Sequence, residues 1–282
     1  MKRLSISVLA LVLFGLAASW LNAGKLSAPA LSAQGPPPPD MPFEEVRLAG
    51  ISGWYLQGDA VRSCVLLLHG IRSNRRQMLP RARFLFDQGY SALAIDLQAH
   101  GESPGEHITF GYRESASARG AVSYLRDKKK CQSVVAIGIS LGGAAALLGP
   151  EPLKVDGYVL ESVYPGIEKA VSNRLKIHLG DWGAVLAPLL YLQIPLRLGI
   201  DLNELQPAEA VRHVNAPVMI MNGTEDRHST PNDARSIHLN APDRSSLVWF
   251  DGASHIDLFA YDQQRYKSAL LDFLELIDRG SK

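Results

Sequence analysis

Three short segments hold the residue types of a hydrolytic serine site. Ser140 is the middle residue of Gly-Ile-Ser-Leu-Gly, Asp226 ends Gly-Thr-Glu-Asp, and His255 ends Gly-Ala-Ser-His. A serine hydroxyl is a weak nucleophile at neutral pH, but an imidazole with a pKa of about 6.5 can take its proton and return it. A carboxylate on the other ring nitrogen fixes the tautomer. We therefore expect Ser140 as nucleophile, Asp226 as acid and His255 as base, in a chain order known for such sites.

Other carboxylates compete with Asp226 for the role of acid. Glu225 is its neighbour, Asp251 lies close to His255 in the chain, and Glu161 ends an apolar run. We favour Asp226 because it follows the carboxyl end of a predicted strand, the edge at which the polar groups of a parallel sheet converge. The three alternatives stay open at this point.

The surroundings of Ser140 suit a nucleophile that projects from a sheet. Residues 134–137 are Val-Val-Ala-Ile, typical of a buried strand, and residues 144–148 are Ala-Ala-Ala-Leu-Leu, typical of a helix. A serine on the sharp turn between them needs strained backbone angles, and Gly138 and Gly142 remove side chains that would collide with the strand and helix nearby. The alternative is a plain glycine-rich turn, since short patterns of this kind also arise by chance.

A second turn supplies candidate donors for a developing negative charge. His69, Gly70 and Ile71 follow an apolar run, and the backbone N–H of Ile71 could join that of Leu141 in an oxyanion hole. We interpret His69 itself as a structural residue.

The remaining histidines and the arginines have simpler interpretations. His228 is expected to be a solvated loop residue rather than part of a pocket, because the chain turns there before Pro231. Neither a His-Glu-x-x-His nor a Cys-x-x-Cys pattern occurs, so a metal site has no sequence support. Five arginines predict a surface helix, with an acidic substrate as the alternative: Arg72, Arg75, Arg76, Arg81 and Arg83.

Apolar runs alternate with helical patterns from residue 41 onward. Residues 43–48 and 53–57 predict an initial hairpin. Runs that are apolar on both faces predict strands inside a covered sheet: 65–68, 92–95, 134–137, 158–160, 218–221 and 247–250. Apolar residues at helical spacing in 118–125 and 266–277 predict helices that face a core. The alternation predicts an α/β fold with a parallel sheet.

Composition limits the class of protein. The chain has 282 residues, of which 46% are hydrophobic and 20% charged. These values fit a globular protein with a sizeable core and exclude a disordered chain. Because 29 Lys and Arg balance 28 Asp and Glu, there is no basic field for nucleic acid, and we expect no nucleic-acid partner.

The N-terminus predicts an export leader. Two basic residues precede Leu4–Leu21, a run of 18 residues without a charge, which is typical of a signal peptide. No clean cleavage site follows, and 18 helical residues at roughly 1.5 Å each nearly cross a bilayer core, so a membrane anchor is the alternative. We expect a signal peptide or anchor over 1–33, a proline-rich spacer over 34–40 and a folded domain over 41–282. The predicted location is secreted or periplasmic, with attachment to the membrane through the N-terminal segment as the alternative.

Together these motifs resemble the α/β-hydrolase family over about residues 41–277. The segment 96–103 is similar to the one that follows the family's fourth strand, and Gly142-Gly143 extends the serine turn as in many members. Within the family, the chain is most similar to bacterial serine hydrolases with a short lid, the BEM46-like and serine aminopeptidase-like group. The resemblance implies an eight-stranded, mostly parallel sheet flanked by helices, with the serine, acid and histidine named above as its triad and with no diffusible cofactor.

The resemblance also bears on the lid and on the cysteines. Residues 164–206 form an insertion where this fold commonly carries a lid. We expect the apolar side chains of this insertion mainly to pack onto the domain, with an acyl or lipid-like substrate as the alternative. In the family's strand order, the strands that Cys64 and Cys131 would begin are parallel neighbours. A disulfide between the two cysteines is therefore feasible, with two buried free thiols as the alternative.

We therefore predict a carboxylesterase-like serine hydrolase that cleaves a small-molecule ester or thioester through an acyl-enzyme on Ser140. An amidase or peptidase with the same triad is one alternative, because the same groups cleave amides once the leaving group is protonated. A non-catalytic binding protein on the same scaffold is another, since a fold does not fix a function. The presence of all three triad residues argues against the binding protein.

Overall fold

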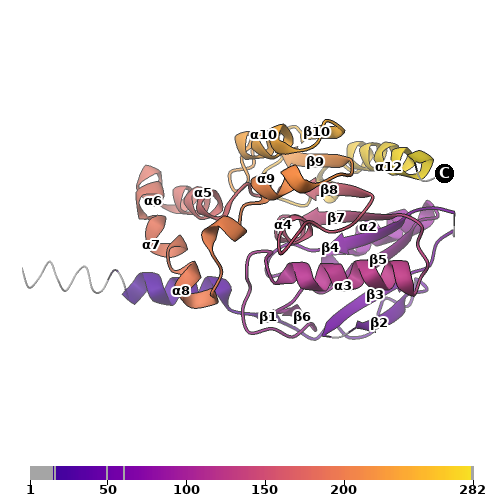
Figure 1. The fold of residues 1–282 in the computed structure, drawn as a ribbon, viewed down its shortest axis with the longest axis horizontal. Helices are drawn as coiled ribbons and strands as arrows, with labels where there is room; N and C mark the ends of the chain where they lie inside the picture. Colours follow the sequence, from indigo (N-terminus) through magenta and orange to yellow (C-terminus); the bar gives the residue numbers. More distant parts are fainter. Residues whose placement is uncertain (1–14, 16, 49, 60, 281–282) are drawn as a thin grey trace, which may run out of the picture.

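The computed structural model describes residues 15, 17–48, 50–59 and 61–280, and its centre is an eight-stranded sheet (Figure 1). The strand order is β10-β9-β8-β7-β4-β5-β3-β2. β3 pairs with β2 and with β5 in antiparallel fashion, whereas the other neighbours are parallel, so the expected mostly parallel sheet is confirmed. The strands are β2 Glu44–Leu48, β3 Ile51–Leu56, β4 Cys64–Leu68, β5 Ser91–Ile95, β7 Val134–Ile139, β8 Gly157–Glu161, β9 Val218–Gly223 and β10 Ser245–Phe250.

The central strands are buried on both faces because they are apolar throughout. In β4, Val65 and Leu67 belong to one layer of the core, while Leu66 and Leu68 belong to the other. Side chains alternate between the faces of a strand, so a strand without polar residues needs cover on both sides. The fold supplies this cover with two layers of helices.

The helices divide between the two faces of the sheet. α2 and α12 pack on the side of Val65, and α3, α4 and α10 pack on the side of Leu66. The two predicted helical stripes lie within α3 and α12. The elements outside the lid are η1 Arg75–Met78, α2 Leu79–Asp87, α3 Glu114–Asp127, α4 Leu141–Leu147, α10 Pro231–Asn240, α11 Leu258–Tyr261 and α12 Gln263–Gly280.

The insertion between β8 and β9 folds into short helices, and the first four of them extend from one end of the molecule (Figure 1). These are α5 Ile167–Leu179, α6 Asp181–Leu186, α7 Pro188–Tyr191, α8 Ile194–Leu198, η2 Leu202–Glu204, α9 Pro207–Ala210 and η3 Val211–His213. We call α5 to α8 the lid. The expectation that its apolar residues mainly pack onto the domain is wrong for part of the lid: Ile194 and Leu198 are buried, but Trp182 is 75% exposed and Leu196 is 81% exposed.

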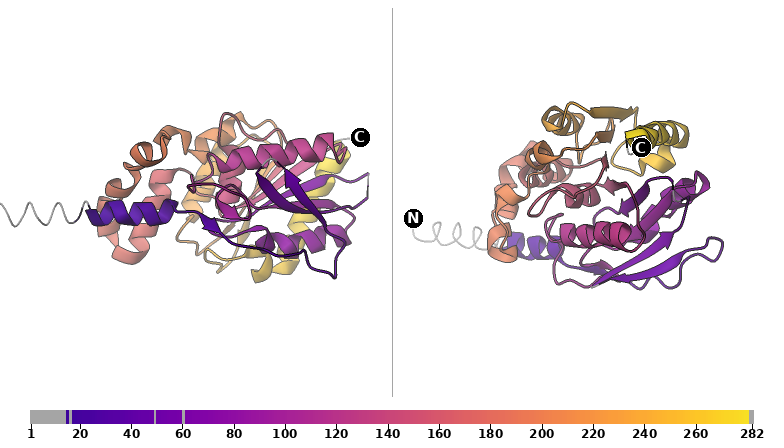
Figure 2. Two further views of the ribbon diagram at one scale, coloured as in Figure 1. Left: turned by 90° about the horizontal axis from the view of Figure 1, so that it is seen from below. Right: turned by 45° about the vertical axis from the view of Figure 1, so that its right-hand side comes forward.

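Residues 17–27 form a helix that lies beside the lid, and the chain then runs along the body as an extended segment (Figure 2). In that segment β1 Ala30–Leu31 pairs in parallel with β6 His100–Gly101. None of the helices among the described residues is long and apolar enough to cross a membrane. Most of the predicted apolar core of the leader lies outside the described residues, so its role stays a prediction.

The two cysteines form a disulfide with a Cα–Cα distance of 5.9 Å. Cys64 begins β4, as expected, but Cys131 does not begin a strand: β7 starts at Val134, which is also the residue paired with Cys64. Cys131 instead lies in the loop between α3 and β7, where its N–H donates to the carbonyl oxygen of Leu125 at 3.1 Å. The bridge lies at the amino ends of these strands.

Candidate active site

Ser140 occupies the sharp turn between β7 and α4. β7 ends at Ile139 and α4 begins at Leu141, so a single residue joins strand to helix. Ser140 has φ 48° and ψ −106°, a conformation that side-chain-bearing residues rarely adopt and that persists only where neighbouring contacts enforce it. One such contact is the hydrogen bond from the Ser140 N–H to the carbonyl oxygen of Glu161, at 2.7 Å.

The glycines beside Ser140 allow this turn because the backbone of neighbouring elements comes very close. A Cβ at Gly138 would collide with the backbone of Gly143 in α4, and a Cβ at Gly142 would collide with the carbonyl of Leu68 at the end of β4. The sequence-based explanation of the glycines therefore agrees with the packing of strand and helix around the turn.

Asp226 and His255 are joined by a hydrogen bond between Oδ2 of Asp226 and Nδ1 of His255, at 2.7 Å. Asp226 follows β9 and His255 follows β10, and these strands are parallel neighbours. The Asp226 side chain is fully buried, and its second oxygen accepts the N–H groups of His228 at 2.8 Å and Ser229 at 2.9 Å. The carboxylate is thus held in place by the loop after β9 independently of the imidazole.

The other candidate acids have different surroundings. Glu161 forms an ion pair with Arg81 at 2.6 Å and also accepts the hydroxyl of Tyr266, deep in the core. Glu225 is exposed, and it is Asp226, not Asp251, that bonds the ring of His255. Among the candidates left open by the sequence, Asp226 is the one placed on His255.

Ile71 and Leu141 lie in the wall of the same cavity as Ser140. Leu141 is the first residue of α4, and an N–H in the first turn of a helix has no acceptor within that helix. The N–H of Ile71 makes no backbone hydrogen bond within the described residues. Two donors are therefore available beside the serine.

His69 is a core residue, in line with its structural interpretation. Its Nδ1 bonds the carbonyl oxygen of Gly70 at 2.8 Å, and its Nε2 accepts the N–H of Leu97 at 3.0 Å. Complete burial lowers the pKa of His69 to about 3, and the neighbouring His100 adds to this effect. The ring is therefore neutral and holds the turn before Ile71 against β5.

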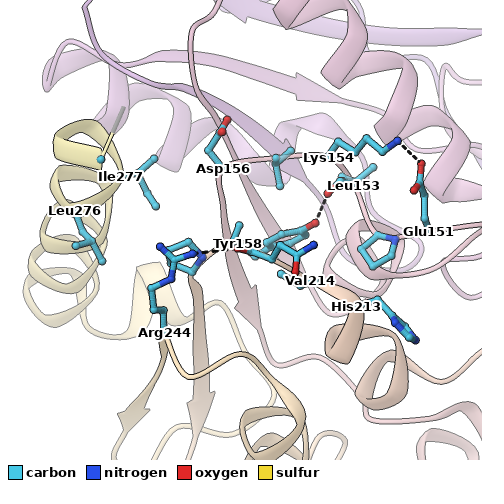
Figure 3. A pocket seen from close by; sticks show the side chains of 16 residues that line it. Glu151, Leu153, Lys154, Asp156, Tyr158, His213, Val214, Arg244, Leu276 and Ile277 are labelled. Atoms are coloured by element: carbon cyan, nitrogen blue, oxygen red, sulfur yellow. Dashed lines mark hydrogen bonds and ion pairs between the residues drawn. The ribbon is translucent and has the colours of Figure 1, made fainter. Parts of the chain in front are cut away.

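Ser140 and His255 line a common cavity of about 380 Å³ between the body and the lid. Its wall is mostly apolar and includes Phe110, Ile167 and Val171. A larger cavity of about 760 Å³ lies at the opposite edge of the sheet, at the amino ends of β8, β9 and β10 (Figure 3). Tyr158 and Arg244 lie there, but no triad candidate does, so the smaller cavity is the candidate site.

Two residues that line the cavity were not expected there from the sequence. His228 lines the cavity with its ring centroid 4.9 Å from that of His255, so its interpretation as a solvated loop residue is wrong. Burial, followed by the charge of His255, lowers the pKa of His228. Ser162, which follows β8 with φ 50°, also lines the cavity, and its buried hydroxyl has no hydrogen-bond partner within the described residues. No motif in the sequence marks Ser162.

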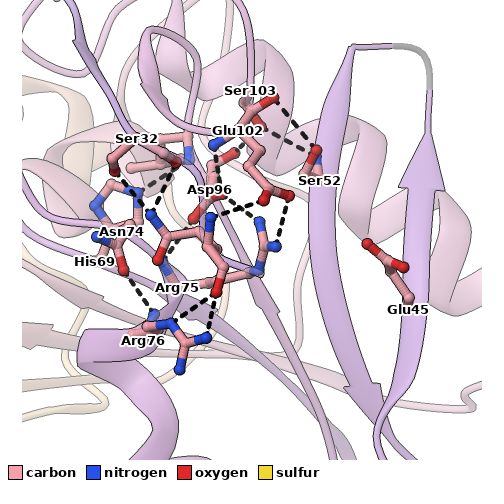
Figure 4. Close-up of polar contacts among 12 residues, drawn as sticks. Ser32, Glu45, Ser52, His69, Asn74, Arg75, Arg76, Asp96, Glu102 and Ser103 are labelled. Atoms are coloured by element: carbon pink, nitrogen blue, oxygen red, sulfur yellow. Dashed lines mark hydrogen bonds and ion pairs between the residues drawn. The ribbon is translucent and has the colours of Figure 1, made fainter. Parts of the chain in front are cut away.

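The arginines after Ile71 do not line the cavity. Figure 4 shows the buried guanidinium of Arg75 between Asp96 and Glu102, and its hydrogen bond lowers the pKa of Glu102 to about 2. Arg81 is equally buried, on Glu161 and Asp257. The surface-helix interpretation is therefore wrong for Arg75 and Arg81, which serve ion pairs inside the fold. No group of three or more potential metal ligands occurs in the described part of the chain.

Comparison with known proteins decides the family. A sequence profile described as the Alpha/beta hydrolase family matches residues 65–267, which include the serine turn and both segments that carry Asp226 and His255. The chain belongs to the alpha/beta hydrolase family. The expected fold class is thus confirmed, while the narrower subgroup stays a prediction.

Several known proteins are similar to the chain over most of its length. A carboxylesterase of Bacillus subtilis is 22% identical over 229 residues, covering 76% of this chain and 93% of that protein. The uncharacterized protein YqkD of the same bacterium is 21% identical, covering 80% and 75%. The esterase Pf2001 of Pyrococcus furiosus has a TM-score of 0.71 at 22% identity, covering 88% of this chain and 98% of the esterase. The esterase structure shows the same fold, and the carboxylesterase supports a hydrolase.

Proposed function

We propose that this alpha/beta hydrolase is a serine hydrolase that cleaves a carboxylic ester or thioester through an acyl-enzyme on Ser140. The observation that carries the proposal is the convergence on one cavity of Ser140, on its strained turn, and His255, hydrogen-bonded to the buried Asp226. A serine hydroxyl reacts when a base takes its proton. Here the base is the imidazole of His255, which Asp226 orients.

In the proposed reaction, His255 takes the hydroxyl proton of Ser140 as the serine oxygen attacks the carbonyl carbon. The N–H groups of Ile71 and Leu141 stabilise the negative oxygen of the tetrahedral intermediate. The imidazolium of His255 then gives its proton to the departing alcohol or thiol, which leaves the acyl group on Ser140. Water, deprotonated by His255, attacks the acyl-enzyme, and return of that proton to Ser140 releases the acid.

The mostly apolar wall of the cavity favours a substrate with a hydrocarbon acyl group. An amidase or peptidase remains the second candidate, because the same groups serve amide cleavage. The carboxylesterase of Bacillus subtilis and the esterase of Pyrococcus furiosus favour esters by relationship. No resident cofactor enters this mechanism.

We further propose that the protein works outside the cytoplasm or at the face of a membrane. The disulfide between Cys64 and Cys131 supports an oxidising compartment. The exposed apolar side chains of the lid, Trp182 and Leu196 among them, support contact with lipid. Cell fractionation of the full chain carrying a C-terminal tag tests this, and recovery in the cytoplasmic fraction with both thiols free would contradict it.

Labelling with a serine-directed fluorophosphonate tests the proposed reaction. The wild type should be labelled, and Ser140→Ala and His255→Ala should each lose at least ~99% of the labelling rate. Ser162→Ala is the matched control, because it removes a second serine hydroxyl from the same cavity but should lower the labelling rate at most several-fold. Labelling that survives Ser140→Ala would overturn the proposal. Acetyl to dodecanoyl esters, thioesters and peptides would then separate an esterase from a peptidase.

A further inference from the structure

Residues 17–34 are held against the folded body by backbone pairing. The N–H of Ala30 donates to the carbonyl oxygen of Ala99, and the N–H of Ser32 donates to that of Gly101, both at 2.8 Å. Further toward the N-terminus, the buried Ser27 accepts the N–H of Ile108 at 2.8 Å with its carbonyl oxygen. This segment therefore packs as part of the fold, unlike a tail that precedes a domain.

The extended part of the segment ends on the buried ion-pair network shown in Figure 4. The N–H of Gln34 donates to Oε1 of Glu102 at 2.7 Å, and Glu102 is the carboxylate held by Arg75. Arg76 in turn donates from Nε to the carbonyl oxygen of Gln34 at 3.2 Å. Gln34 is only 6% exposed. The predicted proline-rich spacer thus begins on a residue that is fixed to the body.

The helical part of the segment is bound to the lid. The guanidinium of Arg197 in α8 lies 4.0 Å from the ring centroid of Trp20 and also donates to the carbonyl oxygen of Trp20 at 2.7 Å. Ser19 donates to the carbonyl oxygen of Leu189 in α7 and accepts a bond from Gln193, each at 2.7 Å. Helix and lid therefore form one unit over the cavity, and Figures 1 and 2 both show them side by side.

Three residues of this helix line the cavity that contains Ser140: Asn22, Lys25 and Leu26. The carbonyl oxygen of Lys25 accepts a hydrogen bond from Arg72, the residue after Ile71, which ties the helix to the turn that carries an oxyanion donor. The exposed residues Lys25 and Arg174, both at the cavity wall, form no ion pair within the described residues. Two unpaired cations beside an apolar wall suit an anionic group on the substrate.

We propose that residues 17–34 remain attached in the working enzyme and form a wall of the substrate pocket, where Leu26 limits the acyl chain and Lys25 favours an ester that carries an anionic group. This inference rests on the proposed hydrolase function. It predicts that the leader is retained rather than cleaved. The small residues Ala23 and Ala30 are the candidate cleavage positions after the leader: cleavage after Ala23 would remove Asn22, and cleavage after Ala30 would remove all three wall residues.

The mass of the intact protein shows whether residues 17–34 stay attached. The full chain with a C-terminal tag is produced in a bacterium, extracted from membrane and soluble fractions with detergent, and its N-terminus is determined by mass spectrometry. A chain that begins before residue 17 in the fraction that reacts with fluorophosphonate supports the inference. A reactive chain that begins after Ala23 or Ala30 overturns it, while leaving the hydrolase function intact.

Two esters of equal chain length test whether Lys25 favours an anionic substrate. p-Nitrophenyl octanoate and the mono-p-nitrophenyl ester of octanedioic acid have the same chain length, but only the second ends in a carboxylate. Lys25→Gln should lower kcat/KM for the acidic ester about fivefold, the effect of one partly exposed ion pair, and should change the neutral ester less than about twofold. Equal effects on the two esters would overturn the role of Lys25.

Leu26→Trp tests the limit on the acyl chain. The larger side chain should lower kcat/KM for the neutral octanoyl ester about tenfold or more relative to the acetyl ester. The control is Leu31→Trp, which alters an exposed leucine of the same segment outside the cavity and should leave the ratio unchanged. An unchanged ratio in Leu26→Trp overturns the inference. If the wild type is not labelled by fluorophosphonate at all, the proposed hydrolase function itself is wrong.

Discussion

The Oδ2 atom of Asp226 lies 2.7 Å from Nδ1 of His255, and the carboxylate is completely buried. Its other oxygen is occupied by the N–H groups of His228 and Ser229, so the acid is oriented before any substrate binds. Such a carboxylate fixes the ring with Nδ1 protonated and Nε2 free to act as a base. This relationship makes the acid the most direct site for a test.

Asp226→Asn should lower kcat/KM for an activated ester by about 10³- to 10⁴-fold, because the amide keeps the shape of the site but no longer stabilises the imidazolium or its tautomer. Steady-state hydrolysis of p-nitrophenyl esters measures the loss. Glu225→Gln is the control, since it changes the exposed neighbouring carboxylate and should have less than about a twofold effect. Comparable losses in both variants would refute the assignment.

His228→Lys should shift the acidic limb of the pH profile of kcat/KM to lower pH by roughly half a unit to one unit. The centroid of the native ring lies 4.9 Å from that of His255, and a permanent positive charge there disfavours protonation of the base, so its neutral form persists to lower pH. His228→Gln should move the limb little, because its lowered pKa already keeps His228 neutral near pH 7. A shift in the opposite direction would contradict the arrangement.

Ser162→Ala should raise KM several-fold with little change in stability. The Ser162 hydroxyl is buried at the cavity and has no partner among the described residues, so its removal breaks no internal bond, whereas a bound ester would lose about 0.5–1.5 kcal/mol of hydrogen bonding. Ser229→Ala is the converse control, because that hydroxyl donates to the carbonyl oxygen of Val163 at 2.6 Å. It should lower Tm, because it leaves the carbonyl oxygen of Val163 without this donor. An unaltered KM in Ser162→Ala would exclude substrate contact.

Much of the fold could be predicted because its signals are local. Strands that are apolar on both faces, such as residues 65–68, imply a covered parallel sheet. The convergence of Ser140, Asp226 and His255 follows from that topology, since each comes after the carboxyl end of a strand in one sheet. A short motif beside each strand was therefore sufficient to place them at one edge.

The features that escaped prediction depend on contacts between distant segments. The burial of Arg75 follows from Asp96 and Glu102, which lie more than twenty positions further along the chain. The place of His228 in the cavity depends on how the lid folds over the loop after β9. The helix of residues 17–27 begins inside the apolar run that predicted the leader, and such a run has the same composition whether it enters a bilayer or packs beside a lid. The sequence therefore gave no signal that Leu26 lines the cavity.

Replacing both Cys64 and Cys131 by alanine should lower the free energy of unfolding by roughly 4 kcal/mol, because the bridge closes a separation of 67 residues. Urea unfolding followed by tryptophan fluorescence measures this change. Activity per folded molecule should stay within about twofold, since the bridge lies at the edge of the sheet opposite to Ser140. An oxidised and a reduced wild type with the same urea midpoint would contradict the expected contribution.

Acidification should destabilise the protein through His69. The pKa of His69 is lowered from 6.5 to about 3 in the folded state, so between these values the unfolded chain binds a proton that the folded chain excludes. The free energy of unfolding should fall by up to ~1.4 kcal/mol for each pH unit below about 6.5. His69→Gln should show a shallower pH dependence in urea titrations, and an equal slope would disprove the contribution.

The lid and the end of α12 lie at opposite ends of the molecule (Figure 1). A handle for purification or surface immobilisation attached after Gly280 therefore sits far from the cavity that holds Ser140. A fusion partner placed at residue 35 or 41 would instead replace the helix of residues 17–27, which Arg197 contacts, and would remove Asn22, Lys25 and Leu26 from the wall of that cavity.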